Sequence, residues 1–489
     1  MVSSQTSGAD DPGLSKSDRS AILLALMCVM MLAALESTIV APAMPSIGRD
    51  LGNVEQMSWI VTAYLVVATA LTPLYGKMAD IKGRRVVLMF AALSFLIGSL
   101  ACALSNSMIM LILARGLQGV GGGGIFAMTQ TIIGDIVPAR DRARYQVYTS
   151  SVWLIANVLG PLLGGLLTEY LHWSMIFWIN LPIGIPALIL IWPKLAKLPR
   201  HERPHSLDII GVFLIIAATV LIMLALSWGG VHYAWSSFEM IMLIAAAILA
   251  WALLTVRQLT AREPLIPVAV LGNKVVRNAV LTSFFAMGAY IGLMVWLPVY
   301  LQTVGGMSVS AAGLATLPLM IFSTVGAQIG AREMRRGRYV YAVPMIGMLI
   351  TASGTFMLAA MAGGMPFWVL IALLTYISSG MGAVFPMLTV TLQSAVAPHD
   401  LGSTMALNVF MRSLGSAIGV AVMGAVLIGI AGSAALEKHG VAGAASPELI
   451  KGFVFAYATS GFGFVLAIIS LIRLGRGPMP QGTASGAIK

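Results

Sequence analysis

The stretch Gly76-Lys-Met-Ala-Asp80-Ile-Lys82-Gly83-Arg84-Arg85-Val-Val-Leu88 separates two apolar runs, residues 57–76 and 85–104. A basic turn between two membrane spans would explain the lysines and arginines, because positive charge gathers on the cytoplasmic side. It would not explain Gly76, Asp80 and Gly83 at these offsets. Glycine permits a tight turn, and Asp80 can pair with Arg84, or with Arg142 or Arg144 further along the chain. We therefore expect Gly76, Asp80, Gly83, Arg84 and Arg85 to form a gate whose charges hold two parts of the protein together in one state and release them in another.

The composition is that of an integral membrane protein. The 489 residues are 58% hydrophobic and only 10% charged, whereas roughly a quarter of the residues in a soluble domain are charged. The mean hydropathy is +0.92. A net charge of +11 would suggest nucleic-acid binding only on the basic face of a soluble domain, and the sequence contains no such domain. We expect residues 1–19 and 477–489 to be cytosolic tails.

Fourteen apolar spans follow the N-terminal tail, each long enough to cross a membrane. They cover residues 20–45, 57–76, 85–104, 107–134, 143–168, 175–193, 207–227, 238–257, 278–301, 309–331, 340–362, 366–390, 401–431 and 452–473. Lysine and arginine gather after spans 2, 4, 6, 8 and 10, whereas the opposite loops hold only Arg49, Lys438 and Lys451. By the positive-inside rule, this alternation places both termini in the cytoplasm. We expect a multi-pass protein of the plasma membrane, the inner membrane of a bacterium.

The first span, AILLALMCVMMLAALESTIVAPAMP (Ala21–Pro45), contains a single acid, Glu36. At 1.5 Å per residue, Glu36 lies roughly 24 Å from Ser20, within a hydrocarbon layer about 30 Å thick. A charge at the centre of a span costs about 2.5–3.5 kcal/mol and normally faces a bundle interior or a wet cavity. Burial disfavours the carboxylate and a nearby cation favours it, so Glu36 can bind and release a proton. Arg115, at a similar depth in the fourth span, is the expected partner; the alternative is an arginine that only binds backbone carbonyls.

Several segments resemble the major facilitator superfamily. The Gly76–Leu88 stretch resembles its signature loop, G-x-L-A-D-R-x-G-R-R/K-x-x-L, with Ile81 where a basic residue is usual. Residues 111–121 resemble the R-x-x-Q-G pattern, which includes Arg115 and Gln118. Residues 156–165 resemble the antiporter motif G-x-x-x-G-P-x-x-G-G, in which Pro161 kinks the span and glycines admit a neighbouring helix. In that motif Gly160, Pro161 and Gly164 are the expected gating residues.

Together with residues 35–45 and 59–64, these motifs make the whole chain similar to the fourteen-helix drug:proton antiporters of this superfamily, in which the acid of the first span is usually Asp. The resemblance implies an all-α membrane protein with the major facilitator fold. Two six-helix bundles, residues 20–196 and 265–476, would flank two inserted helices in residues 197–264. A decayed copy of the signature loop, Gly330–Arg338, begins 254 residues after the first (330 minus 76). Adjacent six-helix units would be closer, so spans 7 and 8 fill the gap.

Transporters built from repeats place substrate near the bilayer midplane, between the repeats. The residues expected to bind substrate are Glu36, Gln118, Trp153, Asn157, Tyr290, Trp296, Tyr376, Phe385, Asn408 and Arg412. Arg412 is the only charge in the membrane core of the second bundle, and it either lines the cavity or bonds to carbonyls. Glu36 and Arg115 are the expected proton-coupling pair. The resemblance implies export of lipophilic, cationic small molecules by alternating access.

Other functional classes lack the residues that they require. A membrane-embedded enzyme needs a cluster of catalytic groups, yet the six histidines lie in loops or at span ends. An ATP-driven pump needs a G-x-x-x-x-G-K-S/T loop, which the sequence lacks, and the G-x-G-x-x-G at residues 119–124 has no preceding strand. We expect a monomer without cofactor or metal that binds protons, small molecules and lipid but no nucleic acid. Export of a lipid, siderophore or other native metabolite remains the alternative, because Met-rich walls are also ordinary membrane packing.

Overall fold

The computed structural model describes residues 16–52, 56–138, 141–196, 208–230, 233–261, 264, 268–307, 309–336, 342–432 and 446–474. These residues are almost all helical, and they include fourteen stretches that are long and apolar enough to cross a membrane. The predicted all-α membrane architecture with fourteen spans is therefore confirmed.

The N-terminal half consists of α1 to α7. Their bounds are α1 Lys16–Leu51, α2 Ser58–Lys82, α3 Arg84–Ala103, α4 Met108–Ile136, α5 Arg142–Tyr170, α6 Met175–Trp178 and α7 Asn180–Leu195. Helix α1 begins at Lys16 and not at residue 20, because the last polar residues of the expected tail add a further helical turn. Asp18 in this turn lies 3.0 Å from Nζ of Lys194, so an ion pair holds the turn against α7.

The C-terminal half consists of α10 to α19. Its helices are α10 Val268–Gly272, α11 Lys274–Thr303, α12 Val309–Ala315, α13 Leu317–Arg336, α14 Ala342–Met361, α15 Phe367–Gly382, α16 Val384–Ala395, the 3-10 helix η3 Pro398–Asp400, α17 Leu401–Ala431 and α19 Pro447–Leu474. The twelfth span is two helices, α15 and α16, that meet at Ala383. A Cβ on the neighbouring Gly382 would lie 1.8 Å from the carbonyl oxygen of Ser323, so glycine is needed where α13 approaches.

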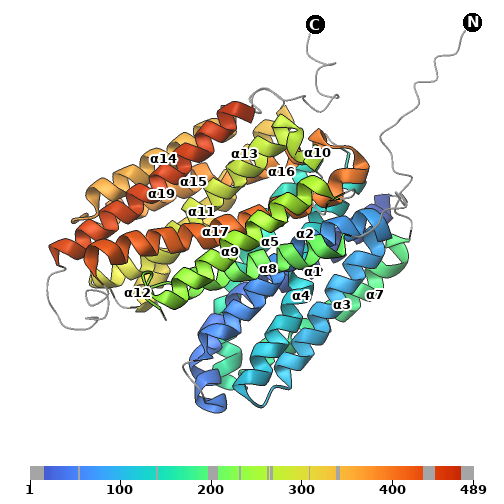
Figure 1. Cartoon of the computed structure of the whole chain (residues 1–489), viewed down its shortest axis with the longest axis horizontal. Helices are drawn as coiled ribbons and strands as arrows, with labels where there is room; N and C mark the ends of the chain where they lie inside the picture. The colour runs from blue at the N-terminus through green and yellow to red at the C-terminus, as the bar shows by residue number, and fades with distance from the viewer. Residues whose placement is uncertain are drawn as a thin grey trace, which may run out of the picture.

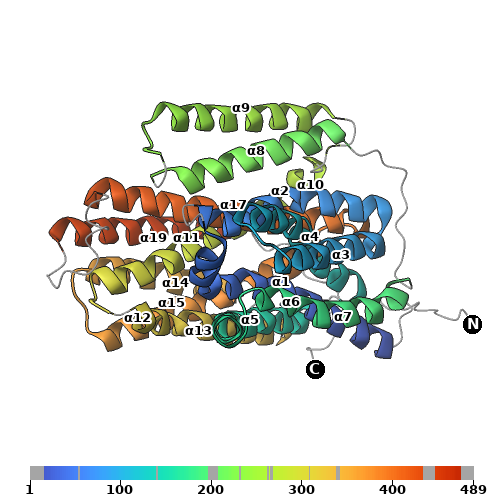
Figure 2. The same cartoon turned by 90° about the horizontal axis from the view of Figure 1, so that it is seen from below.

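Helices α8 (Ile209–Trp228) and α9 (Phe238–Thr260) form a layer of their own outside the two halves (Figure 2). Helix α8 packs against α2 and α17, and the ring of Trp251 in α9 stacks on Phe410 in α17. Asp208 accepts a hydrogen bond from the Gly211 N–H and pairs with Arg257 at 2.8 Å. Burial alone would raise the pKa of Asp208, but the hydrogen bonds from Arg257 and Gly211 lower it below its usual value. The pair of helices thus covers the seam between α2 and α17.

Glycines let α4 pack closely against its neighbours. A Cβ on Gly121 would lie 2.2 Å from the carbonyl oxygen of Ala91 in α3, and one on Gly123 would lie 2.1 Å from that of Ala68 in α2. Both contacts are with backbone atoms, which cannot move aside unless the helices separate. The glycine run at residues 119–124 therefore acts in helix packing, as small residues commonly do in membranes.

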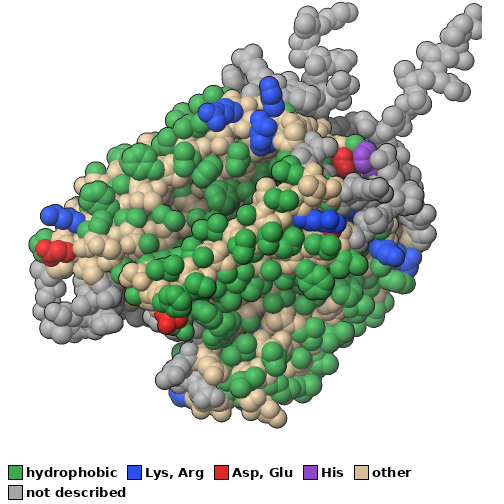
Figure 3. All heavy atoms as spheres, viewed as in Figure 1, with side chains coloured by type: hydrophobic (Ala, Val, Ile, Leu, Met, Phe, Trp, Pro, Cys, Tyr) green, Lys and Arg blue, Asp and Glu red, His purple; other side chains and the backbone are tan. Residues whose placement is uncertain are grey.

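The two halves meet at one end of the molecule and diverge toward the other (Figure 1). Every hydrogen bond described between the halves lies at the meeting end, between α2, α4, α5 or the start of α3 and α16, η3 or α17. We call this end, which carries Asp80 and Ser403, the joined end. On the face drawn in Figure 3, hydrophobic side chains occupy much of the surface along the helices, and lysine and arginine appear mainly near the helix ends. This distribution suits a protein whose flanks face lipid.

Candidate functional site

A cavity of about 400 Å³ lies between the two halves. Helices α1, α2, α4 and α5 line one side, and α11, α13, α15, α16 and α17 line the other. Its wall combines apolar side chains such as Phe126 and Met294 with hydroxyl and amide groups such as Ser323 and Gln130. A concave, mostly apolar surface with a few polar groups is typical of small-molecule sites. The cavity is therefore the candidate substrate site.

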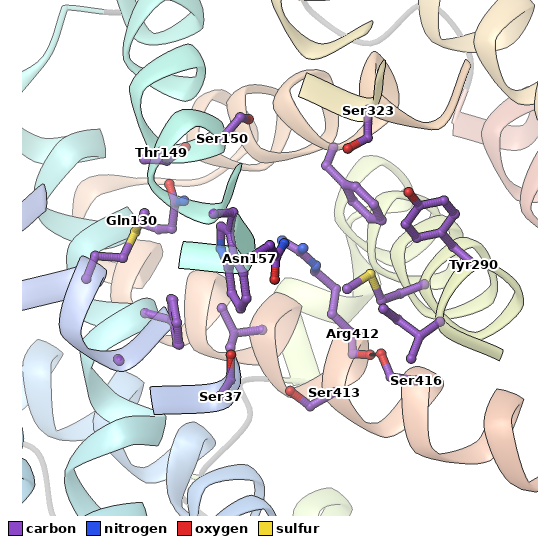
Figure 4. Close-up of a pocket in the computed structure, with 18 of the residues that line it drawn as sticks. Ser37, Gln130, Thr149, Ser150, Asn157, Tyr290, Ser323, Arg412, Ser413 and Ser416 are labelled. Atoms are coloured by element: carbon purple, nitrogen blue, oxygen red, sulfur yellow. Dashed lines mark hydrogen bonds between the residues drawn. The ribbon is translucent and has the colours of Figure 1, made fainter. Parts of the chain in front are cut away.

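Half of the predicted substrate-binding residues line this cavity: Trp153, Asn157, Tyr290, Phe385 and Arg412. Asn157 belongs to α5 of the N-terminal half and Arg412 to α17 of the C-terminal half. Figure 4 shows these two side chains pointing toward one another across the cavity. Both halves thus contribute polar groups to one site, as expected for a site at a repeat interface.

The other predicted substrate-binding residues do not line the cavity. Glu36 and Gln118 are buried inside the N-terminal half, and Trp296 donates its indole N–H to a backbone carbonyl of α17 at 3.0 Å. Tyr376 is 42% exposed and does not belong to the cavity wall. Asn408, in α17, is buried and does not belong to the wall either. Neighbouring side chains point to different faces of a helix. Packing against other helices sets the rotation of each helix about its own axis, and this rotation decides which side chains face the cavity.

Glu36 and Arg115 form a buried ion pair, the contact that their similar depth predicts. Nη1 of Arg115 in α4 contacts Oε1 of Glu36 in α1 and donates to Oε1 of Gln118 at 2.7 Å. Nε of Arg115 donates to the Ile60 carbonyl at 2.9 Å. Nδ2 of Asn180 donates to the second carboxylate oxygen at 2.9 Å. Glu36 and Arg115 are each 1% exposed. Because a buried charge is stable only with close partners, these hydrogen bonds and the ion pair are what allow both side chains to be buried.

Two members of this network, Asn180 and Ser99, were not among the residues predicted from the sequence. Nδ2 of Asn180, at the start of α7, also donates to Oγ of Ser99 in α3 at 2.7 Å, and this hydroxyl donates to the Phe177 carbonyl at 2.9 Å. An amide inside the apolar run at residues 176–182 was the available signal for Asn180. Ser99 gave no comparable signal in the sequence, because a serine in a membrane helix usually forms a hydrogen bond with the backbone of its own helix.

Tyr64 of α2 contacts both the ion pair and the cavity. Its side chain lines the cavity, and the guanidinium carbon of Arg115 lies 4.5 Å from the centroid of its ring. Ser37, the residue after Glu36, also faces the cavity, whereas neither Glu36 nor Arg115 belongs to the described cavity wall. Tyr64 therefore contacts both a member of the buried ion pair and the space that substrate would fill.

Asp80 and Arg84 bind the two halves together at the joined end. Oδ2 of Asp80 accepts hydrogen bonds from the Ser403 N–H at 3.0 Å and from its hydroxyl at 2.6 Å, so an acid of α2 caps the first turn of α17. Arg84 pairs with Asp80 at 2.9 Å and with Asp135 at 3.1 Å. It also donates to the Pro398 carbonyl at 2.9 Å. One of the pairings predicted for Asp80, with Arg84, is thus present.

Arg142 and Gln393 add further contacts at this end. Nη1 of Arg142 in α5 donates to the Gln393 carbonyl at 3.1 Å, and Nε2 of Gln393 in α16 donates to the Gln130 carbonyl at 2.9 Å. The predicted gating residue Arg85 lies elsewhere, with its guanidinium carbon 3.9 Å from the centroid of the Trp192 ring. Both residues belong to the N-terminal half, so this contact of Arg85 does not cross between the halves.

The two glycines of the predicted gating loop meet different needs. A Cβ on Gly76 would lie 2.7 Å from the Gly402 carbonyl oxygen and 2.9 Å from Cα of Ser403. Gly76 therefore allows the backbones of α2 and α17 to touch across the joined end. Gly83 has a φ of 86°, in the region that favours glycine, and it forms the break between α2 and α3.

Gly160, Pro161 and Gly164 lie within the N-terminal half, where α5 packs on α1. A Cβ on Gly160 would lie 1.9 Å from Oγ1 of Thr38, and one on Gly164 would lie 2.3 Å from the Ile39 carbonyl oxygen. Pro161 is inside α5. These contacts are only a few residues along α1 from Glu36. The predicted gating role of the three residues would thus have to act through α1, and it remains a prediction.

Comparison with known proteins identifies the family. Residues 26–420 match the family model of the Major Facilitator Superfamily, most of the chain. The chain belongs to the Major Facilitator Superfamily. The multidrug transporter protein MdtP of Bacillus subtilis (strain 168) is 34% identical over 428 residues, which cover 86% of this chain and 78% of that protein. Multidrug resistance protein 3 of the same organism is 31% identical over 405 residues, 83% of this chain and 79% of its own length.

A solved structure shares the fold of this chain. The human organic anion transporter MFSD10 (TETRAN) superimposes with a TM-score of 0.67 at 17% identity, over 93% of this chain and 99% of that chain. At this identity the likeness shows the shared fold alone. The predicted family is thus confirmed, and this Major Facilitator Superfamily transporter is a multi-pass membrane protein with multidrug efflux proteins among its relatives.

Proposed function

We propose that this transporter exports lipophilic small molecules in exchange for protons by alternating access. The buried pair of Glu36 and Arg115 is the observation that carries the proposal. Among the described residues, Glu36 is the only acid near the middle of a membrane span. A buried carboxylate with a cationic partner, next in the chain to the cavity-lining Ser37, can take up a proton and return it as its surroundings change. Export fits the antiporter-like motif at residues 156–165 and the efflux relatives.

In the proposed cycle, the structure is the state closed toward the cytoplasm. From the charge pattern we expect the joined end and both termini on that side, and in this proposal the contacts of Asp80, Arg84 and Gln393 hold the joined end shut. Protonation of Glu36 removes the charge that Arg115 balances, and α1 passes this change to α5 through the contacts at Gly160 and Gly164. The closed state loses stability, and the joined end opens to receive substrate. The transporter would act in a plasma membrane as a monomer.

A cationic substrate, which the family resemblance implies, would be attracted by a carboxylate at the binding site. Glu36 does not line the cavity and already pairs with Arg115. The geometry therefore supports the proton-coupling role of Glu36 more than a direct contact with a cation. Export or flipping of a lipid, siderophore or native metabolite is the second candidate function, because an apolar cavity between membrane helices also suits acyl chains.

The purified protein in liposomes with an imposed pH gradient tests the proposal. We expect the gradient to drive accumulation of lipophilic dyes, and we expect dissipation of the gradient to stop it. Fluorescent lipids tested in the same vesicles address the second candidate. Movement of lipid without movement of any dye would favour a flippase, and transport that ignores the gradient would remove proton coupling.

Asp80→Asn is expected to slow exchange while leaving substrate affinity almost intact. The amide keeps one acceptor oxygen for Ser403 but loses the charge that pairs with Arg84, and Asp80 does not line the cavity. Loss of such an interaction changes the balance of states by about 1–3 kcal/mol. Turnover and half-saturation concentration in proteoliposomes check this prediction. Normal turnover with affinity weakened more than about tenfold would contradict it.

Helices α8 and α9 are expected to make no contact with substrate. They lie outside both halves and contribute no residue to the cavity wall. Photo-crosslinking with an azide-bearing substrate, followed by peptide mapping, checks this expectation. Labels should fall on the helices of the two halves, and labelling mainly within residues 208–257 would show that the substrate site is misplaced.

A further inference from the structure

The cavity carries one charge, and it is positive. Of the described residues that line it, Arg412 alone is ionisable at neutral pH; the others are apolar or bear hydroxyl and amide groups. Glu36, the acid in the middle of α1, does not belong to the described wall and already pairs with Arg115. No described residue of the wall therefore balances the charge of Arg412 in the space where substrate would bind.

Within the part of the chain that the structure describes, the Arg412 guanidinium also has no hydrogen-bond acceptor. Its carbon lies 4.4 Å from the centroid of the Phe385 ring, a contact that favours a cation but accepts no conventional hydrogen bond. Among the described residues, no carbonyl, hydroxyl or carboxylate accepts from its nitrogens; the nearby Ser416 hydroxyl donates to the Arg412 backbone carbonyl instead. The alternative, in which Arg412 only forms hydrogen bonds with backbone carbonyls, is therefore not supported. Arg412 lies roughly 17 Å along α17, a depth at which an unpaired charge is costly and usually functional.

Asn157 supplies a second group across the cavity. Its side chain, from α5, points toward that of Arg412 (Figure 4), and no described residue forms a hydrogen bond with its amide. The guanidinium has only donors, and the amide of Asn157 can present two more. Donors that converge from two sides suit an anionic group with several oxygen atoms, while a cation would meet like charge.

We propose that the preferred substrate is an amphipathic anion whose carboxylate, sulfonate or phosphate binds between Arg412 and Asn157, with its apolar body against the aromatic and Met-lined wall. This assignment rests on the proposed export function, since it names the substrate class of the same cavity. The anion would bridge the two halves, because Asn157 and Arg412 belong to different halves. Its charge would balance Arg412 and leave the Glu36–Arg115 pair undisturbed.

A matched pair of probes tests the charge preference. The anion 8-anilinonaphthalene-1-sulfonate and the neutral N-phenyl-1-naphthylamine share one aromatic body and differ by the sulfonate. Equilibrium dialysis against nanodiscs with and without the protein gives saturable binding, with ethidium as the cationic comparison. We expect the sulfonate to bind at least about tenfold more tightly than the neutral probe. Equal binding of the pair, or tighter binding of ethidium, would overturn the proposal.

Variants then test whether the preference for the sulfonate probe depends on Arg412. Arg412→Gln should weaken binding of the sulfonate about tenfold or more and leave the neutral probe within about twofold, while Arg412→Lys should retain part of the preference. Arg277→Gln removes an exposed arginine at the start of α11, far from the cavity wall, and should change neither probe. If Arg412→Gln does not give monodisperse protein, Asn157→Leu tests the opposite wall in the same way. Equal weakening of both probes would contradict the proposal.

Transport separates this inference from the function on which it rests. If the pH gradient moves neutral dyes but the sulfonate has no advantage, export stands and the anion assignment fails. If no probe moves but Arg412-dependent sulfonate binding persists, the site stands and proton-driven export fails. Labelled phosphatidylglycerol, compared with labelled phosphatidylcholine in the same vesicles, shows whether the anionic group comes from a lipid or from a free amphiphile.

Discussion

Glu36→Gln is expected to abolish export driven by a pH gradient while the protein still folds. The amide cannot ionise, so it mimics the protonated carboxyl permanently and leaves no proton to exchange. It keeps an oxygen for Arg115, which also retains its bonds to Gln118 and to the Ile60 carbonyl. Efflux driven by the pH gradient and thermal stability in detergent, measured on the same purified variant, check both parts. Binding of neutral substrates should change little, because Glu36 is outside the cavity wall.

Two further variants make this result interpretable. Glu36→Asp keeps the carboxylate one methylene shorter and should retain part of the coupled transport. If Glu36 only braces Arg115, then Glu36→Gln should instead destabilise the protein, since breaking a buried pair costs about 3–5 kcal/mol. The double variant Glu36→Gln, Arg115→Gln would then recover stability. Stable Glu36→Gln protein with full proton-coupled efflux would remove Glu36 from the mechanism.

Gly76→Ala is expected to hold the joined end open and reduce transport at least about tenfold. The added Cβ would lie 2.5 Å from that of Ala406 and 2.7 Å from the Gly402 carbonyl oxygen, so the closed state survives only if α2 and α17 move apart. Overpacking of this kind costs about 1–3 kcal/mol, and it acts only in the state where the two helices touch. Spin labels at exposed positions on the two sides, Lys82→Cys and Ala397→Cys, should report a smaller population at short distance.

Gly429→Ala provides the matched control for this substitution. Gly429 also lies within α17, but a Cβ there would meet no atom within 4 Å. Transport and label distances should therefore match those of the parent protein. If Gly76→Ala also leaves both unchanged, then the contact between α2 and α17 does not limit the cycle.

Charge pattern and local motifs were enough to predict the membrane architecture and the pair at its centre. Alternating basic loops and apolar spans depend on the cost of burying charge in lipid, which acts on each segment separately. Similar depth favoured a pair of Glu36 and Arg115 over an arginine that binds only backbone carbonyls, and the structure contains the pair. Asn180 and Ser99 could not be predicted in this way, because an uncharged polar side chain can also form hydrogen bonds within its own helix.

The walls of the cavity and the contacts of the gate depended on how the helices are rotated and brought together. Tyr376 and Asn408 looked as suitable for a binding site as Tyr290 and Asn157, yet only the latter two face the cavity. Likewise, the loop motif singled out Asp80, but its bond to the first turn of α17 joins residues 323 positions apart. When a lipid-facing helix has apolar residues on all sides, its own sequence does not determine how it is rotated about its axis. Close packing at glycines and the satisfaction of buried polar groups determine it, and both are properties of the assembled bundle.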